Sequence, residues 1–210
     1  MAMRGGELRG DSDDGGDIVK THTGEPLRVV VITTIAQTMA AFFEKQLRMM
    51  AEDGFEVHAV SSPGPALDAL DVGDAVRRHG LFMERKPRPL QDLTSLWQLL
   101  RLMRRIRPHI VHAHTPKAGL LGMLAARLAG VPVRLYTVHG LPLETRAGMK
   151  RKILEFAERA SAASSTSTYS VSRSVREIVV RFRLCPPEKV SVLGDGSCAG
   201  VDTERFQRSS

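Results

Sequence analysis

Short apolar runs rich in β-branched residues recur along the chain, and longer segments with helical spacing lie between them. The first run is LRVVVIT, residues 27–33, which is typical of a strand buried on both faces of a parallel sheet. Residues 38–53 follow with an apolar stripe at helical spacing, and Gly54 is suited to end that helix. Residues 57–61 form the next predicted strand. This order predicts a β–α–β unit with parallel strands.

The same alternation continues to residue 193. We expect further strands at 81–85, 109–114, 133–138, 167–171 and 190–193, and helices at 93–107, 118–129, 149–161 and 175–182. Strands that alternate with helices predict an open parallel sheet with helices on both faces and right-handed crossovers. The predicted fold class is therefore α/β and Rossmann-like, and 210 residues suit one such domain.

The two ends depart from this pattern. Residues 1–26 are rich in Gly and Asp and lack apolar periodicity, which predicts a disordered leader before a domain at 27–193. Residues 194–210 begin with a glycine-rich stretch, which we interpret as a truncated interdomain linker. The sequence shows neither a secretory h-region nor an apolar run of membrane-spanning length. Two cysteines make no disulfide framework, so a reduced, cytoplasmic location is expected.

Charge is distributed unevenly. The chain has net charge +7, and three basic against six acidic residues give 1–26 a charge of −3, which leaves +10 for the rest. Nine basic residues against two acidic ones lie in 77–107. This excess favours a negatively charged partner, although an Arg-rich composition alone would produce it too. Nucleic acid is disfavoured because only 5% of residues are aromatic, which leaves few stacking platforms.

The predicted helix at 93–107 has two faces. We expect Leu93, Leu96, Trp97, Leu100 and Met103 to form its inward stripe. A second, basic face carries Arg101, Arg104 and Arg105. We predict that this face contacts an anionic membrane, which would place the chain peripherally at the inner membrane face. An ordinary solvated face is the alternative interpretation.

In an open parallel sheet, ligands bind outside the carboxyl ends of the strands. Thr33 and Thr34 follow the first strand. Neither a GxGxxG dinucleotide fingerprint nor a GxxxxGK[ST] phosphate loop is present. A helix N-terminus with threonines can still bind phosphate through backbone N–H groups, and a simple N-cap is the alternative.

The segment HIVHAHTPK, residues 109–117, ends another strand. His112 and His114 should share one face, with His109 on the other. Such a pair can bind metal, but no third ligand has suitable spacing, so no metal site is predicted. His112 is interpreted as a hydrogen-bonded core residue. His114, Thr115 and Lys117 are predicted to contact ligand at the strand end.

His139 and Gly140 follow the strand predicted at 133–138. A strand-end His next to Gly places an imidazole at the rim of a cleft, where substrate can approach the backbone. The imidazole could donate a proton or bind a sugar hydroxyl. A turn with a solvated His is the alternative.

The block RPHIVHAHTPKAGLLGMLAARLAGVPVRLYTVHGLP, residues 107–142, resembles the acceptor-domain signature of family 4 glycosyltransferases, nearest to the bacterial branch that builds polysaccharides and lipid-linked glycans. TYSVSRSVREIVV (168–180) resembles that family's strand and Ser-led helix. KVSVLGDGSCAGVDTERF (189–206) is similar to its link into a second domain. The family often has Asp in place of His109, and Asn in place of Asp195 and Ala199.

The resemblance implies the N-terminal half of a GT-B enzyme that transfers sugar, with retention, from a nucleotide-sugar to a glycan or polyprenyl-linked acceptor. It implies a catalytic role for His139 near the reacting sugar, and no metal or other cofactor. It places Thr33 and Thr34 near the donor phosphates, and His114, Thr115 and Lys117 on the acceptor side, with Gly140 also expected to contact substrate.

The family's donor-side basic residues and paired glutamates lie in the second domain, so this chain alone is expected to turn over negligibly. A separate donor-domain chain is a possible partner. Two alternatives stay open: a non-catalytic module that binds acceptor or membrane, and a fragment of a GT-B-type nucleotide-sugar epimerase.

Overall fold

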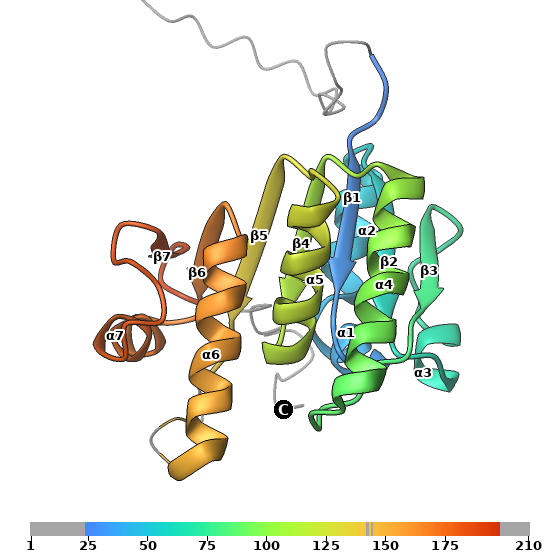
Figure 1. Ribbon diagram of the computed structural model, residues 1–210. Coiled ribbons are helices and arrows are strands. Elements are labelled where there is room, and N and C mark those ends of the chain that lie inside the picture. The colour runs from blue at the N-terminus through green and yellow to red at the C-terminus, as the bar shows by residue number, and fades with distance from the viewer. Residues whose placement is uncertain (1–23, 142, 144, 198–210) are drawn as a thin grey trace, which may run out of the picture.

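A computed structural model describes residues 24–141, 143 and 145–197 of the chain. Its centre is one seven-stranded, all-parallel sheet in the order β3-β2-β1-β4-β5-β6-β7 (Figure 1). The strands are β1 Arg28–Ile32, β2 Glu56–Ser61, β3 Val76–Gly80, β4 Ile110–His114, β5 Val133–Val138, β6 Ser167–Ser170 and β7 Val190–Val192. The predicted α/β, Rossmann-like fold class is therefore confirmed.

The helices lie on both faces of this sheet. They are α1 Ala36–Phe42, α2 Glu44–Glu52, α3 Pro65–Asp68, α4 Pro89–Ile106, α5 Pro116–Leu128, α6 Gly148–Ser164 and α7 Arg173–Arg181. In Figure 1, α4, α5 and α6 stand side by side in front of the sheet, with α1 and α2 behind it. The alternating side chains of β1 divide between two cores accordingly: Val30 and Ile32 join one buried cluster, and Val29 and Val31 join the other.

Two predictions for the first half of the sheet are wrong. The third strand is β3 and not 81–85, because Arg77 and Arg78 are exposed on this edge strand and break the apolar pattern expected of a strand. The helix predicted at 38–53 is two helices separated at Phe43, whose φ of −122° is not helical. The break buries Phe43 and turns Phe42 outward.

Helix α4 differs in part from its prediction, because it begins at Pro89 and only some of the predicted stripe faces the core. Met103 is buried, and Leu96 and Leu100 pack against the core, whereas Leu93 and Trp97 are 64% and 57% exposed. A serine lies on the buried face of the helix instead. The Ser95 hydroxyl, 2% exposed, donates to the carbonyl oxygens of Phe82 and Gln91.

The predicted disordered leader at 1–26 and linker at 194–210 fall largely outside the described residues, since 1–23 and 198–210 are not described. Cys198 is among the latter, and Cys185 is a buried free thiol. Across the part of the chain that the structure describes, we find no helix with both the length and the apolarity to cross a membrane.

Candidate active site

Two histidines meet where β4 and β5 end at the carboxyl edge of the sheet. The paired strands place His114 opposite Thr137, so His139, two residues further on, lies just beyond the same face. His114 Nδ1 and His139 Nε2 are 3.0 Å apart and hydrogen bonded. One imidazole must donate and the other accept, so the tautomer of His114 fixes which nitrogen of His139 carries its proton.

Phe43 covers this pair from the break between α1 and α2. Its ring centroid lies 4.0 Å from that of His114, and its edge meets His139 at a centroid distance of 5.9 Å. On the other side of His114, the His112 ring lies 4.0 Å away and its Nε2 is hydrogen bonded to Thr137 Oγ1 at 2.8 Å. His112 and His114 thus share a face as predicted, and His112 is hydrogen bonded as predicted. The packing holds the imidazoles in fixed orientations.

Burial keeps this histidine cluster neutral. Loss of water contact lowers the pKa of His112 to about 4 and that of His139 below its ordinary value of 6.5. Burial, with the neighbouring His112 and His139, lowers the pKa of His114 well below 6.5. The buried His114 Nε2 has no hydrogen-bond partner within the described residues. Among these residues no three His, Cys, Asp or Glu side chains are grouped to hold a metal ion.

Thr33 and Thr34 lie at the end of β1, where they are buried and their hydroxyls are occupied. Thr33 Oγ1 donates to the carbonyl of Ile35 at 3.1 Å. Thr34 Oγ1 is hydrogen bonded to Thr115 Oγ1 at 2.7 Å and accepts from the backbone N–H of Ala118 at 3.3 Å. Thr34 therefore caps the start of α5 across the sheet, a task that the N-terminal residue of a helix usually performs itself. The burial of Thr33, Thr34 and His114 argues against direct substrate contact by their side chains.

Thr115 connects β4 to α5 in an unusual backbone conformation. Its φ of 70° and ψ of 149° lie in a region that L residues rarely adopt. The hydrogen bond to Thr34 holds it there, and the strain fixes the direction in which α5 leaves the strand end. Thr115 is partly exposed, so contact with substrate stays a prediction for it.

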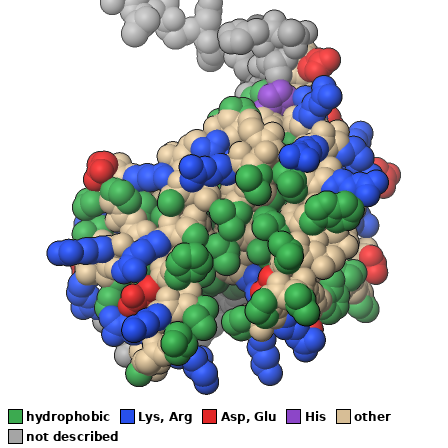
Figure 2. Space-filling view, viewed as in Figure 1, with side chains coloured by type: hydrophobic (Ala, Val, Ile, Leu, Met, Phe, Trp, Pro, Cys, Tyr) green, Lys and Arg blue, Asp and Glu red, His purple; other side chains and the backbone are tan. Residues whose placement is uncertain are grey.

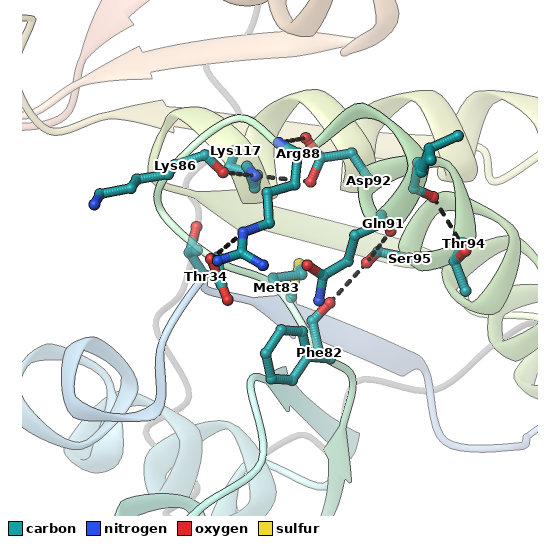
Figure 3. A network of polar contacts seen from close by, with 12 residues as sticks. Thr34, Phe82, Met83, Lys86, Arg88, Gln91, Asp92, Thr94, Ser95 and Lys117 are labelled. Carbon is teal, nitrogen blue, oxygen red and sulfur yellow. Dashed lines mark hydrogen bonds and ion pairs between the residues drawn. The ribbon is translucent and has the colours of Figure 1, made fainter.

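Lys117 is engaged in the first turn of α5. Figure 3 shows its side chain reaching the Asp92 carboxylate and the backbone carbonyl of Lys86. The Nζ–Oδ1 distance is 2.7 Å, and the Lys117 side chain is only 10% exposed. The ion pair joins α5 to α4, and the hydrogen bond to Lys86 joins α5 to the loop that follows β3. Lys117 is therefore at the predicted strand end, but its charge is already balanced by a carboxylate.

Gly140 lies beside His139, and a Cβ built there would meet no atom within 4 Å. This open space fits the predicted approach of substrate to the backbone, which stays a prediction. Arg101, Arg104 and Arg105 are exposed, as a membrane contact requires. Arg104 and Arg105 lie in the last turn of α4, however, at the end of the sheet opposite His139 (Figure 1).

Sequence reasoning missed a groove between α5 and α6, next to Lys117. It has a volume of about 750 Å³, within the range of ligand-binding clefts. Arg85, Lys86, Arg146 and Lys150 line it together with apolar side chains. The sequence did contain a signal for this groove. Two basic residues, Arg85 and Lys86, precede the motifs that end β4 and β5, and two more, Arg146 and Lys150, follow them. Phe43 was also missed as a site residue, since helical spacing placed it in the core.

The chain matches the model of the glycosyl transferase 4-like domain over residues 37–196, which is most of its length. This span contains β4, β5, His114 and His139. The chain belongs to the glycosyl transferase 4-like family. The sequence resemblance is thereby confirmed at the level of the family.

Curated relatives agree with this membership. The chain is 36% identical over 162 residues to the capsular polysaccharide biosynthesis glycosyltransferase CapM of Staphylococcus aureus, covering 77% of this chain and 42% of that protein. It is 31% identical over 189 residues to the UDP-Gal:alpha-D-GlcNAc-diphosphoundecaprenol alpha-1,3-galactosyltransferase of Escherichia coli, covering 89% of this chain and 47% of that protein. The chain thus spans less than half the length of these two relatives.

Solved structures share the fold at low sequence identity. Anabaena Alr3699/HepE in complex with UDP and glucose has a TM-score of 0.61 at 13% identity, over 87% of this chain and 47% of that one. A UDP-N-acetylglucosamine 2-epimerase has a TM-score of 0.58 at 18% identity, over 81% of this chain and 49% of that one. The glycosyl transferase 4-like domain therefore has the same architecture as half of each of these proteins.

Proposed function

We propose that this chain is the acceptor-side domain of a retaining glycosyltransferase that moves a sugar from a nucleotide-sugar to a lipid-linked glycan acceptor. The observation that carries the proposal is the fixed His114–His139 pair at the carboxyl edge of a family 4-like domain. The name of the E. coli relative supports the substrate classes, since it pairs UDP-Gal with a diphosphoundecaprenol acceptor.

In this proposal His139 is the catalytic residue. A neutral imidazole can accept a hydrogen bond from a sugar hydroxyl or donate one to it, without the cost of placing a charge in a partly buried site. Burial favours that neutral form by lowering the pKa of His139. His114 is a positioning residue, because it orients the His139 ring and sets its tautomer without itself reaching solvent.

The direct contacts expected of Thr115, Lys117 and Gly140 remain part of the proposal, on the acceptor side. Thr33 and Thr34 shape the loop that follows β1, and their phosphate contacts, if the donor approaches here, would use backbone N–H groups. No cofactor besides the nucleotide-sugar is proposed. We propose that this domain without a donor-side domain turns over negligibly.

We also propose that the domain works at an anionic membrane surface. Large apolar side chains are exposed on α4 and α6, both of which begin near the carboxyl edge of the sheet (Figure 1). Leu90 of α4 is 86% exposed, and Met149 and Phe156 of α6 are 71% and 69% exposed. Figure 2 shows hydrophobic side chains interspersed with Lys and Arg side chains on this face, which is the pattern of a surface that rests in lipid headgroups.

The test uses a fused enzyme, in which residues 1–197 of this chain precede the part of the E. coli relative that the chain does not match. It is incubated with UDP-galactose labelled in the sugar and with the diphosphoundecaprenol-linked GlcNAc acceptor. We expect label in the lipid extract, and none from the chain alone. The E. coli enzyme is the positive control.

The products also separate the alternatives. Conversion of the free nucleotide-sugar into an epimer would indicate an epimerase, an alternative that is supported by the shared fold alone. An acceptor that binds but receives no sugar, while the E. coli control is active and the fused enzyme is folded, would indicate a non-catalytic module and contradict the proposal.

A further inference from the structure

The groove between α5 and α6 has an apolar floor. Leu120 and Leu121 of α5 face Ile153, Leu154 and Ala157 of α6 across it. It opens at the carboxyl edge of the sheet, since Pro116 and Lys117 in its wall directly follow the strand end of β4. In Figure 2 this part of the molecule is notched, with hydrophobic and basic side chains on both sides of the notch. A floor of this composition fits a hydrocarbon chain better than a sugar.

The rim of the same groove is strongly basic. Arg85 and Lys86 lie on the α4 side, and Arg146 and Lys150 lie on the α6 side. No ion pair neutralises any of these four side chains within the described residues. Among the described lining residues the one carboxylate, that of Asp92, is already paired with Lys117. Four uncompensated positive charges at one mouth favour a ligand group with several negative charges, such as a diphosphate.

The groove offers little to a nucleobase. Among the described residues its lining contains Arg, Lys, Pro, Asp, Leu, Ile and Ala but no aromatic side chain. Bases in protein sites are usually stacked on aromatic or guanidinium planes, and the four cations here are exposed, whereas Leu121 of the lining is buried. The combination of an anionic head with an apolar tail therefore fits better than a nucleotide does.

We infer that this groove binds the prenyl diphosphate portion of a lipid-linked acceptor, with the diphosphate on Arg85, Lys86, Arg146 and Lys150 and the first prenyl units on the floor. The inference rests on the proposed function, which it deepens by locating the lipid part of the acceptor. Exposed apolar residues lie in the first turns of α4 and α6, close in sequence to residues that line the groove, so its mouth would open toward the membrane that supplies the lipid.

The probe is farnesyl diphosphate, a short and water-soluble prenyl diphosphate. Its binding to the 210-residue chain is measured by calorimetry and by the fluorescence of Trp97, the single tryptophan. We expect the double variant Arg146→Gln, Lys150→Gln to weaken binding at least tenfold. Ile153→Asn should weaken farnesyl diphosphate and leave inorganic diphosphate unchanged. Both sites are exposed, so the variants should fold, and circular dichroism checks this.

The matched control is the double variant Arg104→Gln, Arg105→Gln, which removes the same charge at the far end of α4 and should bind as the unmodified chain does. Equal affinity for inorganic diphosphate, UDP and farnesyl diphosphate would overturn the inference, as would equal loss in both double variants. The readout is binding alone. If the binding prediction fails while the fused enzyme transfers sugar, the inference about the groove is wrong and the proposed function stands. If farnesyl diphosphate binds as predicted but no sugar is transferred, the groove stands and the proposed function is wrong.

Discussion

At the scale of single residues, the proposed chemistry depends on the hydrogen bond between His114 Nδ1 and His139 Nε2. Asn at position 114 can place a polar atom close to the Nδ1 position, whereas Leu cannot. In the fused enzyme we expect His114→Asn to keep most of the transfer rate and His114→Leu to lose at least tenfold, with a changed pH–rate profile. Equal losses with unchanged pH profiles would reduce His114 to a packing residue.

Tyr136 of β5 and Glu158 of α6 form a second buried pair of polar side chains. The Tyr136 hydroxyl donates to Glu158 Oε2 at 2.8 Å, and burial raises the pKa of Glu158 to about 7. The folded chain therefore binds this proton more tightly than the unfolded chain, whose carboxyl titrates near 4.5. The contribution of Glu158 to the free energy of unfolding is greatest below pH 4.5 and falls as pH rises toward 7, by up to about 3 kcal/mol.

Glu158→Gln removes this titration. Between pH 5 and pH 7.5 the unmodified chain should lose stability relative to the variant, as measured by urea unfolding at each pH. The histidines are common to both proteins, so their titration cancels in the comparison. Parallel stability profiles would show that Glu158 is ionised in the folded chain at both pH values.

At the scale of elements, α5 packs closely on β5 through a glycine. A Cβ at Gly119 would lie 2.2 Å from Cε2 of the buried Tyr136 ring, whereas at Gly122 the nearest atom would be the end of the Ile32 side chain at 2.9 Å. Tyr136 is held by Glu158 and cannot move aside easily. We expect Gly119→Ala to destabilise the chain by about 3 kcal/mol and Gly122→Ala by clearly less, in thermal or urea unfolding.

Both variants remove one glycine from the same helix, so helix propensity affects them alike. Equal stabilities of the two variants would contradict the close packing of α5 against Tyr136.

Sequence predicted β1 well because its apolar run is buried on both faces of the sheet. The structure also confirms β5 at its predicted bounds, although Arg134 interrupts that strand's apolar pattern. β3 was missed because it is an edge strand with exposed Arg77 and Arg78, so its sequence lacks the apolar run by which buried strands are recognised. Leu93 and Trp97 of α4 were misassigned to the core because Ser95 is buried through its hydrogen bond to Phe82, which local spacing does not reveal.

The candidate site was partly predictable for the same reason. The rule that parallel strands end at one edge places His114 and His139 at that edge, and the structure adds the hydrogen bond between them. The hydrogen bonds of the Thr34 hydroxyl to Thr115 and Ala118 could not be predicted, because they depend on how the end of β1 packs against α5. The groove required the relative placement of α5 and α6, which the sequence pattern does not contain.

At the scale of the whole molecule, net charge and exposed apolar residues predict binding to membranes. The chain carries net charge +7, and it should pellet with vesicles that contain anionic lipid at low salt and be released at high salt. The variant Leu90→Gln, Phe156→Gln should bind less, because it removes exposed apolar area from α4 and α6. Equal binding to neutral vesicles would contradict an electrostatic contact.

The same assay locates the contact. Arg101→Gln, Arg104→Gln, Arg105→Gln removes the basic face first expected to touch the membrane, and we expect it to cost less than the apolar variant. The opposite order would move the contact to the far end of α4.

The central claim is that this domain supplies the acceptor-side wall of a sugar-transfer site with His139 at its rim. The most direct measurement is the rate of galactose transfer by the fused enzyme with His139→Ala, together with its thermal unfolding. We predict a loss of at least about 100-fold in rate with an unchanged unfolding midpoint, since a positioned general acid or base contributes on the order of 10² to 10⁴. A rate near that of the unmodified fused enzyme would remove His139 from the site and contradict the account.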